Sequence, residues 1–174
     1  MDAAALTRVA EGFLKGCSDV IGAMLSTAPV FQVGEAEEAA EGTLRELLAE
    51  SPFAAQSALS GGGAVIFLAA LDDARRVVSS VKGEAAVAAP TLSEDEVAAM
   101  TEVFDPCMGG GVGQFKEQYG KTVTLQPVQI GLATPGGAAA MMTALGATPA
   151  LVRFSYSVPG VVDDGRGALL FSRT

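Results

Sequence analysis

Apolar residues recur every three or four positions between residues 3 and 28, near the start of the chain. This spacing puts them on one side of a helix and predicts a long amphipathic helix that Pro29 ends. A short strand is expected at Val30–Val33, and a partly exposed helix in the acidic stretch Glu35–Glu50. The apolar positions of the first helix are Leu6, Val9, Phe13, Cys17, Val20, Ile21 and Met24.

Two apolar runs on either side of a glycine-rich turn follow. Residues Ala54–Leu59 and Ala64–Ala70 flank Ser60-Gly61-Gly62-Gly63, the pattern of a β-hairpin. The spacing of apolar residues in Asp72–Val81 indicates a further helix. The Ala/Val/Pro stretch Lys82–Pro90 is expected to link two halves of the chain.

A second long helix is predicted after this linker. Ser93 and Glu96 have the spacing of a capping box, and Gly120 is placed to end the helix. The elements expected after it are a strand at Thr122–Ile130, a short helix within 135–146, and strands at Leu151–Val158 and Ala168–Ser172.

The second half of the chain resembles the first. A shift of 91 positions places Glu11 on Glu102 and Phe13 on Phe104, and three further pairs are similar (Ile21 with Val112, Gly22 with Gly113, Met24 with Phe115). We therefore expect one domain over 1–174, built from half-repeats at about 1–82 and 91–174. The predicted fold is α+β, with a pseudo-twofold axis and one mixed sheet that carries the long helices on one face.

Composition limits the chemistry. The net charge is −9, which disfavours nucleic acid and anionic membranes as partners. Histidine is absent, so Ser-His-Asp catalysis, Cys-His catalysis and histidine metal sites are excluded, and no metal site is expected. The two cysteines, Cys17 and Cys107, are expected to be free, buried thiols. No secretory signal is seen, and a cytoplasmic location is expected.

Glycine motifs carry little functional signal. Gly120-Lys121-Thr122 ends like a phosphate-binding loop, but Phe115 stands where that motif needs a glycine. The glycines of Gly109–Gly113 lie within the predicted helix, where they favour close helix packing or a locally weakened helix.

A pair of carboxylates on the second long helix is more informative. Glu102 and Asp105 are three residues apart, so both project from the side opposite the apolar stripe. Ala98 and Gly109 lie one turn away on either side and leave room for a partner. The alternative is an ordinary solvated acidic face.

The segment Glu102–Gly109, with Pro127 further on, resembles the signature of the CheC/CheX/FliY chemotaxis phosphatases. The order of helices and strands is similar over most of the chain. Because the chain ends soon after its last predicted strand, the compact, single-domain CheX-like members are the expected match. The resemblance implies binding to a phosphorylated CheY-type response regulator and hydrolysis of its aspartyl phosphate, with magnesium held by the regulator and no cofactor on this chain.

The resemblance assigns roles to individual residues. Glu102 would anchor to a lysine of the regulator, and Asp105 would place the attacking water, with Ala98 and Gly109 as partner-binding positions. Asp105 stands where the family has an asparagine, and Ala98 where it has Asp or Ser. An ionised carboxylate accepts hydrogen bonds but cannot donate them, so reduced or absent activity is expected.

Thr7, Glu11 and Leu14 occupy the corresponding positions of the first half, as a vestigial second site in which Leu14 replaces the asparagine. The alternative function is a catalytically inactive module that binds a response regulator or a flagellar switch component. The resemblance also implies a homodimer that pairs through a sheet edge, for which Ala168–Ser172 is the candidate strand.

Overall fold

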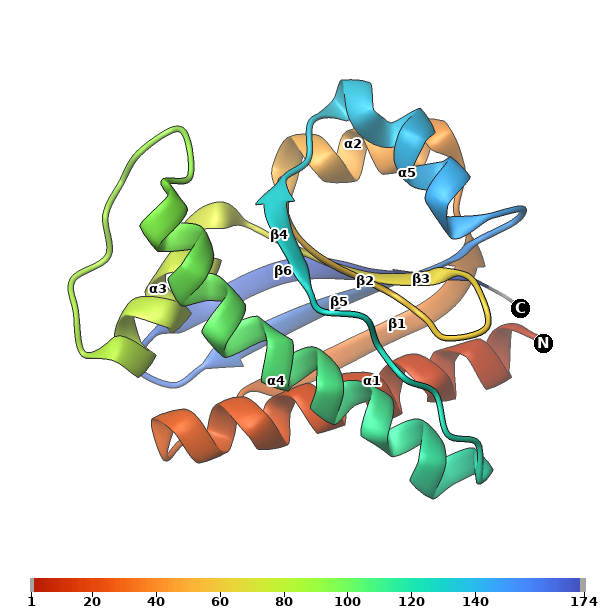
Figure 1. Ribbon diagram of the computed structural model, residues 1–174, viewed down its shortest axis with the longest axis horizontal. Helices are drawn as coiled ribbons and strands as arrows, with labels where there is room; N and C mark the ends of the chain where they lie inside the picture. Colours follow the sequence, from red (N-terminus) through yellow and green to blue (C-terminus); the bar gives the residue numbers. More distant parts are fainter. Residues whose placement is uncertain (1, 173–174) are drawn as a thin grey trace.

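The computed structural model describes residues 2–172, which form a six-stranded sheet with helices on both faces (Figure 1). The first long helix, the hairpin and the second long helix are confirmed. In chain order the elements are α1 (Ala3–Leu25), β1 (Val30–Glu38), α2 (Glu41–Glu50), β2 (Phe53–Ala58), β3 (Ala64–Ala69), α3 (Leu71–Lys82), α4 (Glu94–Tyr119), β4 (Gln129–Leu132), a 3-10 turn (Pro135–Gly137), α5 (Ala138–Leu145), β5 (Ala150–Val158) and β6 (Val162–Phe171).

The sheet carries the predicted internal symmetry. Its strand order is β1-β5-β6-β3-β2-β4. Exchanging the two halves swaps β1 with β4, β2 with β5 and β3 with β6, and it returns the same order in reverse. The pseudo-twofold axis therefore passes between β3 and β6, which pair at the centre of the sheet.

A mixed sheet was expected, but the pairings are antiparallel throughout residues 2–172. The reason lies in the helical connections. A helix that links two adjacent strands makes them parallel. Here α2 leads from β1 to β2 and α5 leads from β4 to β5, and neither pair of strands is adjacent.

The acidic stretch after Pro29 begins as a strand. β1 continues to Glu38, so the helix expected over Glu35–Glu50 is wrong for its first third, and α2 begins only at Glu41. Around Ala36, whose side chain is buried, the neighbouring glutamates are exposed. This pattern is typical of an edge strand with one face exposed to solvent.

Two strands of the second half also differ from expectation. The strand predicted at Thr122–Ile130 is regular only as β4, at Gln129–Leu132, and the residues before it run as irregular extended chain. Ala168–Ser172 was expected to be a free edge, but most of it belongs to β6, which lies between β5 and β3. It has no free edge for a second copy, because β1 and β4 form the two edges of the sheet.

The sheet separates two hydrophobic cores. The larger core packs α1, α3 and α4 against one face, and the smaller core packs α2 and α5 against the other (Figure 1). Both long helices thus lie on the same face, as predicted. Strand β3 is buried along its whole length because it is central and covered on both sides, which explains the unbroken apolar run of Ala64–Ala69.

The two long helices approach each other closely through glycines. A methyl group on Gly16 would lie 2.2 Å from the carbonyl oxygen of Gly110, and one on Gly111 would lie 2.7 Å from the ring of Phe13. Close to this crossing, the Cys17 thiol donates to the backbone oxygen of Cys107 at 3.2 Å. The glycine run of α4 therefore serves close helix packing at Gly110 and Gly111, one of the two roles considered from the sequence.

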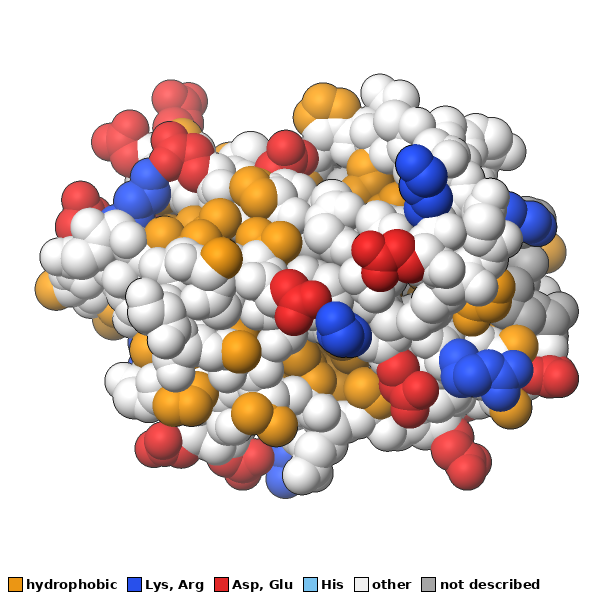
Figure 2. Space-filling model, turned by 90° about the horizontal axis from the view of Figure 1, so that it is seen from below, with side chains coloured by type: hydrophobic (Ala, Val, Ile, Leu, Met, Phe, Trp, Pro, Cys, Tyr) orange, Lys and Arg blue, Asp and Glu red, His pale blue; other side chains and the backbone are white. Residues whose placement is uncertain are grey.

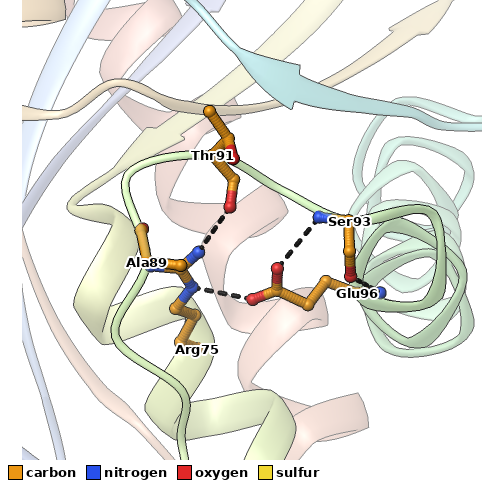
Figure 3. A network of polar contacts seen from close by, with 5 residues as sticks. All are labelled: Arg75, Ala89, Thr91, Ser93 and Glu96. Atoms are coloured by element: carbon orange, nitrogen blue, oxygen red, sulfur yellow. Dashed lines mark hydrogen bonds and ion pairs between the residues drawn. The ribbon is translucent and has the colours of Figure 1, made fainter.

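A buried arginine fixes the start of α4 (Figure 3). Arg75 on α3 is 5% exposed and donates to Glu96 at 2.9 Å. It also donates to the carbonyl oxygens of Ala89 at 2.5 Å and Thr91 at 3.0 Å. Glu96 completes the predicted capping box, since Ser93 donates its N–H to the Glu96 carboxylate and accepts from the Glu96 N–H. The linker between the halves is thus held to both neighbouring helices.

Replacement of Gly16 tests the helix crossing. Gly16→Ala should lower the free energy of unfolding by about 1–3 kcal/mol, because the added methyl group meets the backbone of α4. Gly42→Ala is the control, since a methyl group there contacts no atom within 4 Å and should be neutral or slightly stabilising. Urea unfolding of both variants measures the difference, and equal stabilities would contradict the close crossing.

Glu96 should make stability sensitive to acid. Its pKa lies below the ordinary value because its carboxylate accepts from the Ser93 N–H and from Arg75, although burial opposes the shift. Its stabilising contribution is present above the pKa of about 4.3 of a free glutamate and is lost as the pH falls through the lower pKa of the folded state. In urea unfolding from pH 7 to pH 3, Glu96→Gln should therefore be least stable relative to wild type near pH 7, with the difference shrinking below about pH 4. Glu94→Gln, in the same turn but without a bond to Arg75, should not show this convergence.

Candidate functional site

Four residues form an exposed stripe along α4. Ala98, Glu102, Asp105 and Gly109 are all exposed, at spacings of four, three and four residues. The stripe faces outward because the opposite side of the helix, which includes Phe104, is buried against the sheet. The structure thus brings together the residues predicted for the main site.

Glu102 already has a cationic partner within the chain. Its carboxylate forms an ion pair with the ammonium group of Lys82, the last residue of α3. The side chains are 66% and 32% exposed, respectively. An exposed pair of this kind is weak, so another cation can displace Lys82 at little cost.

Asp105 is tied to the chain that leads into β4. Its Oδ1 atom accepts a hydrogen bond from the backbone N–H of Val128 at 3.0 Å. Val128 follows Pro127, the proline of the family motif. The Asp105 carboxylate therefore joins α4 to the neighbouring extended segment, and its other oxygen makes no hydrogen bond to residues 2–172.

A groove runs beside the stripe, between α4 and the extended segment Thr122–Pro127. It encloses about 420 Å³, and its helical wall includes Asp105, Gly109, Gly113 and Lys116. A methyl group added to either glycine would contact nothing within 4 Å. Gly109 and Gly113, the outer glycines of the segment Gly109–Gly113, thus leave this wall without side chains. Gly110 and Gly111, the inner ones, pack against α1.

In the described part of the first half, the three corresponding residues are not all exposed. Leu14 is 1% exposed and belongs to the larger core. The Thr7 hydroxyl accepts from the N–H of Ala36 and donates to the carbonyl of Ala3. Glu11 is exposed and lies one helical turn from both residues, but Thr7 is only partly exposed. Thr7, Glu11 and Leu14 therefore do not form an accessible set.

Cys17 and Cys107 are free and buried, as predicted. Burial raises the pKa of the Cys107 thiol to about 12, and burial followed by the proximity of Cys107 raises the pKa of Cys17. Neither is a thiolate at neutral pH. Among the described residues, no three Cys, Asp or Glu side chains are grouped closely enough to hold a metal ion. None of the described helices has the length and apolarity needed to cross a membrane.

The view from below shows single Lys and Arg side chains interspersed with Asp and Glu (Figure 2). Apolar patches on this side are small and separate. No continuous basic patch is seen among the described residues on this side.

Sequence reasoning missed the groups that contact the predicted residues. Lys82 lies 20 positions before Glu102, and Val128 lies 23 positions after Asp105. No rule based on sequence spacing predicts a contact between residues this far apart in the chain. Gly113 and Lys116 could have been recognised as groove residues, because they follow Gly109 at four and seven positions on the same side of the helix.

No protein-family model matches this chain, and no curated protein matches it in sequence. Several solved structures match it in fold. FliY of Thermotoga maritima is 13% identical, with a TM-score of 0.79 over 98% of this chain and 89% of that chain. FliM in a FliG–FliM complex from H. pylori is 10% identical, with a TM-score of 0.70 over 96% and 90%. CheX of Desulfovibrio desulfuricans is 12% identical, with a TM-score of 0.57 over 93% and 97%.

These identities establish the fold alone. The order of helices and strands agrees with the order implied by the resemblance around Glu102 and Asp105. The chain therefore has the fold shared by the FliY, FliM, CheX and CheC-like structures.

Proposed function

We propose that this chain is a cytoplasmic docking module of the chemotaxis and flagellar-switch type. Its partner is a phosphorylated CheY-type response regulator, which binds the exposed stripe of α4. The module does not speed the hydrolysis of the regulator's aspartyl phosphate. Three features support the proposal: the fold, the exposure of Glu102 and Asp105 on one face, and the contact that Asp105 makes.

The hydrogen bond from Val128 to Asp105 carries the proposal. A family asparagine at this position would offer an N–H₂ donor to the attacking water and the phosphoryl group. The Asp105 carboxylate can only accept hydrogen bonds, and its Oδ1 atom already accepts one from the backbone N–H of Val128. Its negative charge also opposes the approach of an anionic phosphoryl group. The carboxylate at position 105 is therefore compatible with docking but does not support catalysis.

Glu102 supplies the attraction for the regulator. Its carboxylate is well exposed and pairs with Lys82. When a lysine of the regulator displaces Lys82, Glu102 still has one cationic partner. Such an exchange costs little because both pairs are solvated. The regulator's own magnesium neutralises part of the phosphoryl charge near Asp105.

Phosphatase activity is the second candidate function. It is favoured by the exposure of both carboxylates on one side of α4, with Asp105 also lining the groove. Phosphoryl transfer needs mainly positioning and charge stabilisation, so the lack of histidine does not exclude it. A flagellar switch component is the alternative partner for the same docking role, since one relative of this fold is FliM in complex with FliG.

The identity of residue 105 decides between the two functions. With a CheY-type regulator phosphorylated by acetyl phosphate in magnesium buffer, wild-type protein in excess should leave the decay rate of the phosphoryl group unchanged. Asp105→Asn should speed the decay at least tenfold. An asparagine keeps an oxygen for the Val128 N–H and adds the missing donor, and a single donor is worth about 10²–10³ in rate in other enzymes.

Asp105→Ala is the matched control, because it removes both the acceptor and the charge and should give no acceleration. Acceleration by the wild type would establish the phosphatase and refute the docking-only function. A wild type that also fails to bind the phosphorylated regulator would refute docking itself.

Lys82 should compete with the partner for Glu102. Lys82→Met removes the internal cation, so the dissociation constant for the phosphorylated regulator, measured by titration calorimetry, should fall by about two- to fivefold, the effect of one exposed ion pair. Arg76→Met removes the same charge from an exposed position on α3 without touching Glu102. If both variants change the affinity equally, the effect is one of net charge, and the direct competition is wrong.

A further inference from the structure

The groove beside α4 has an open backbone edge on its outer wall. The segment Thr122–Pro127 bonds to the hairpin on its inner side only: Thr124 accepts from the N–H of Ser60 at 2.8 Å, and Gln126 donates to Ala58 at 2.9 Å. Leu125 is bridged with Leu59 between these two hydrogen bonds, so its N–H points away from the hairpin. The N–H of Val123, two residues earlier in the extended segment, is expected on the same side. These two N–H groups have no hydrogen-bond partner within residues 2–172.

The opposite wall of the groove is bare helix backbone. Gly109 and Gly113 are one helical turn apart and carry no side chain, and no atom fills the space where a Cβ would stand. A ligand backbone can therefore approach α4 more closely here than on an ordinary helix. Val112, Val123 and Leu125 line the groove with apolar surface.

The two ends of the groove differ in charge. Lys116 lines one end, is exposed, and forms no ion pair with the described residues. Asp105 lines the other end with one oxygen still open. Eleven helical residues separate them by about 16 Å, the length of about five residues of extended chain.

We propose that this groove binds an extended peptide segment of a partner protein as an added β-strand. The peptide pairs with the free N–H groups of Val123 and Leu125, and its backbone lies against Gly109 and Gly113. An acidic side chain at one end meets Lys116, which fixes the direction of the strand. Strand addition of this kind takes its affinity from main-chain hydrogen bonds and its specificity from a few side chains.

This proposal does not rest on the docking of a folded response regulator to the stripe, although both surfaces include Asp105 and Gly109. Selection from a random hexapeptide library on the purified wild-type protein, with no regulator present, provides the probes. Recovered peptides should lack proline within the pairing stretch and carry Asp or Glu near one end. In ¹⁵N NMR spectra, the amides of Val123, Leu125, Gly109 and Gly113 should shift on titration.

Gly113→Leu places a side chain in the groove, and its Cβ would have no atom within 4 Å, so it should fold normally and weaken binding of the selected peptides at least tenfold. Gly42→Leu, at an equally open position on α2, is the matched control and should leave binding unchanged. Lys116→Gln keeps the groove open and should remove the preference for acidic peptides.

Three results would overturn the proposal: no peptide recovered, equal binding to the Gly113→Leu variant, or shifts confined to other surfaces. Failure here would leave regulator binding intact, and failure of regulator binding would leave the peptide results unaffected, so the two proposals are judged apart.

Discussion

The contact between α1 and α4 through glycine backbones is the constraint on which the rest of the structure depends. Because neither Gly16 nor Gly110 has a side chain, the two helices meet at backbone distance, and a methyl group at the crossing would overlap the opposite chain. The contact fixes the rotation of α4 about its own axis. Phe104 and its apolar neighbours then face the sheet, and Glu102, Asp105 and the outer glycines face solvent.

A second constraint joins each long helix to the chain beside it. Asp105 accepts from the Val128 N–H ahead of β4, and Thr7 accepts from the Ala36 N–H in β1. The two contacts come from different positions of the half-repeats but have a common physical cause. Each extended segment has an N–H that its neighbouring strand does not satisfy, and a helix side chain supplies the acceptor. At α4 this structural role falls on Asp105, the residue that the resemblance predicts to place the attacking water.

Local signals in the sequence were sufficient for much of the fold. The three-and-four spacing predicted both long helices, the Ser60–Gly63 turn predicted the hairpin, and Ser93 with Glu96 predicted the start of α4. Each of these depends on residues that are near one another in the chain. The leucines of α2 predict a helix for the whole acidic stretch, and the glutamates at the end of β1 do not reveal where the strand stops, because charged residues suit both an edge strand and an exposed helix.

Sheet order and the surroundings of the site could not be predicted in this way. The central position of β6 depends on pairing with β3, about a hundred residues away, and the direction of each pair depends on which strands become neighbours. The sequence did place Glu102 and Asp105 on an exposed helix face. It could not show that Glu102 pairs with Lys82 or that Asp105 accepts from the Val128 N–H. Those contacts exist only after α3 and the extended segment have packed beside α4.

The most direct test of the central claim is a ¹⁵N NMR titration of the wild-type protein with a CheY-type regulator held in its phosphorylated form by beryllofluoride. The account predicts amide shifts concentrated on α4 between residues 98 and 109, and none around residues 7–14 of α1. Shifts on α1 or over α2 and α5, or the same shifts with the unphosphorylated regulator, would contradict it.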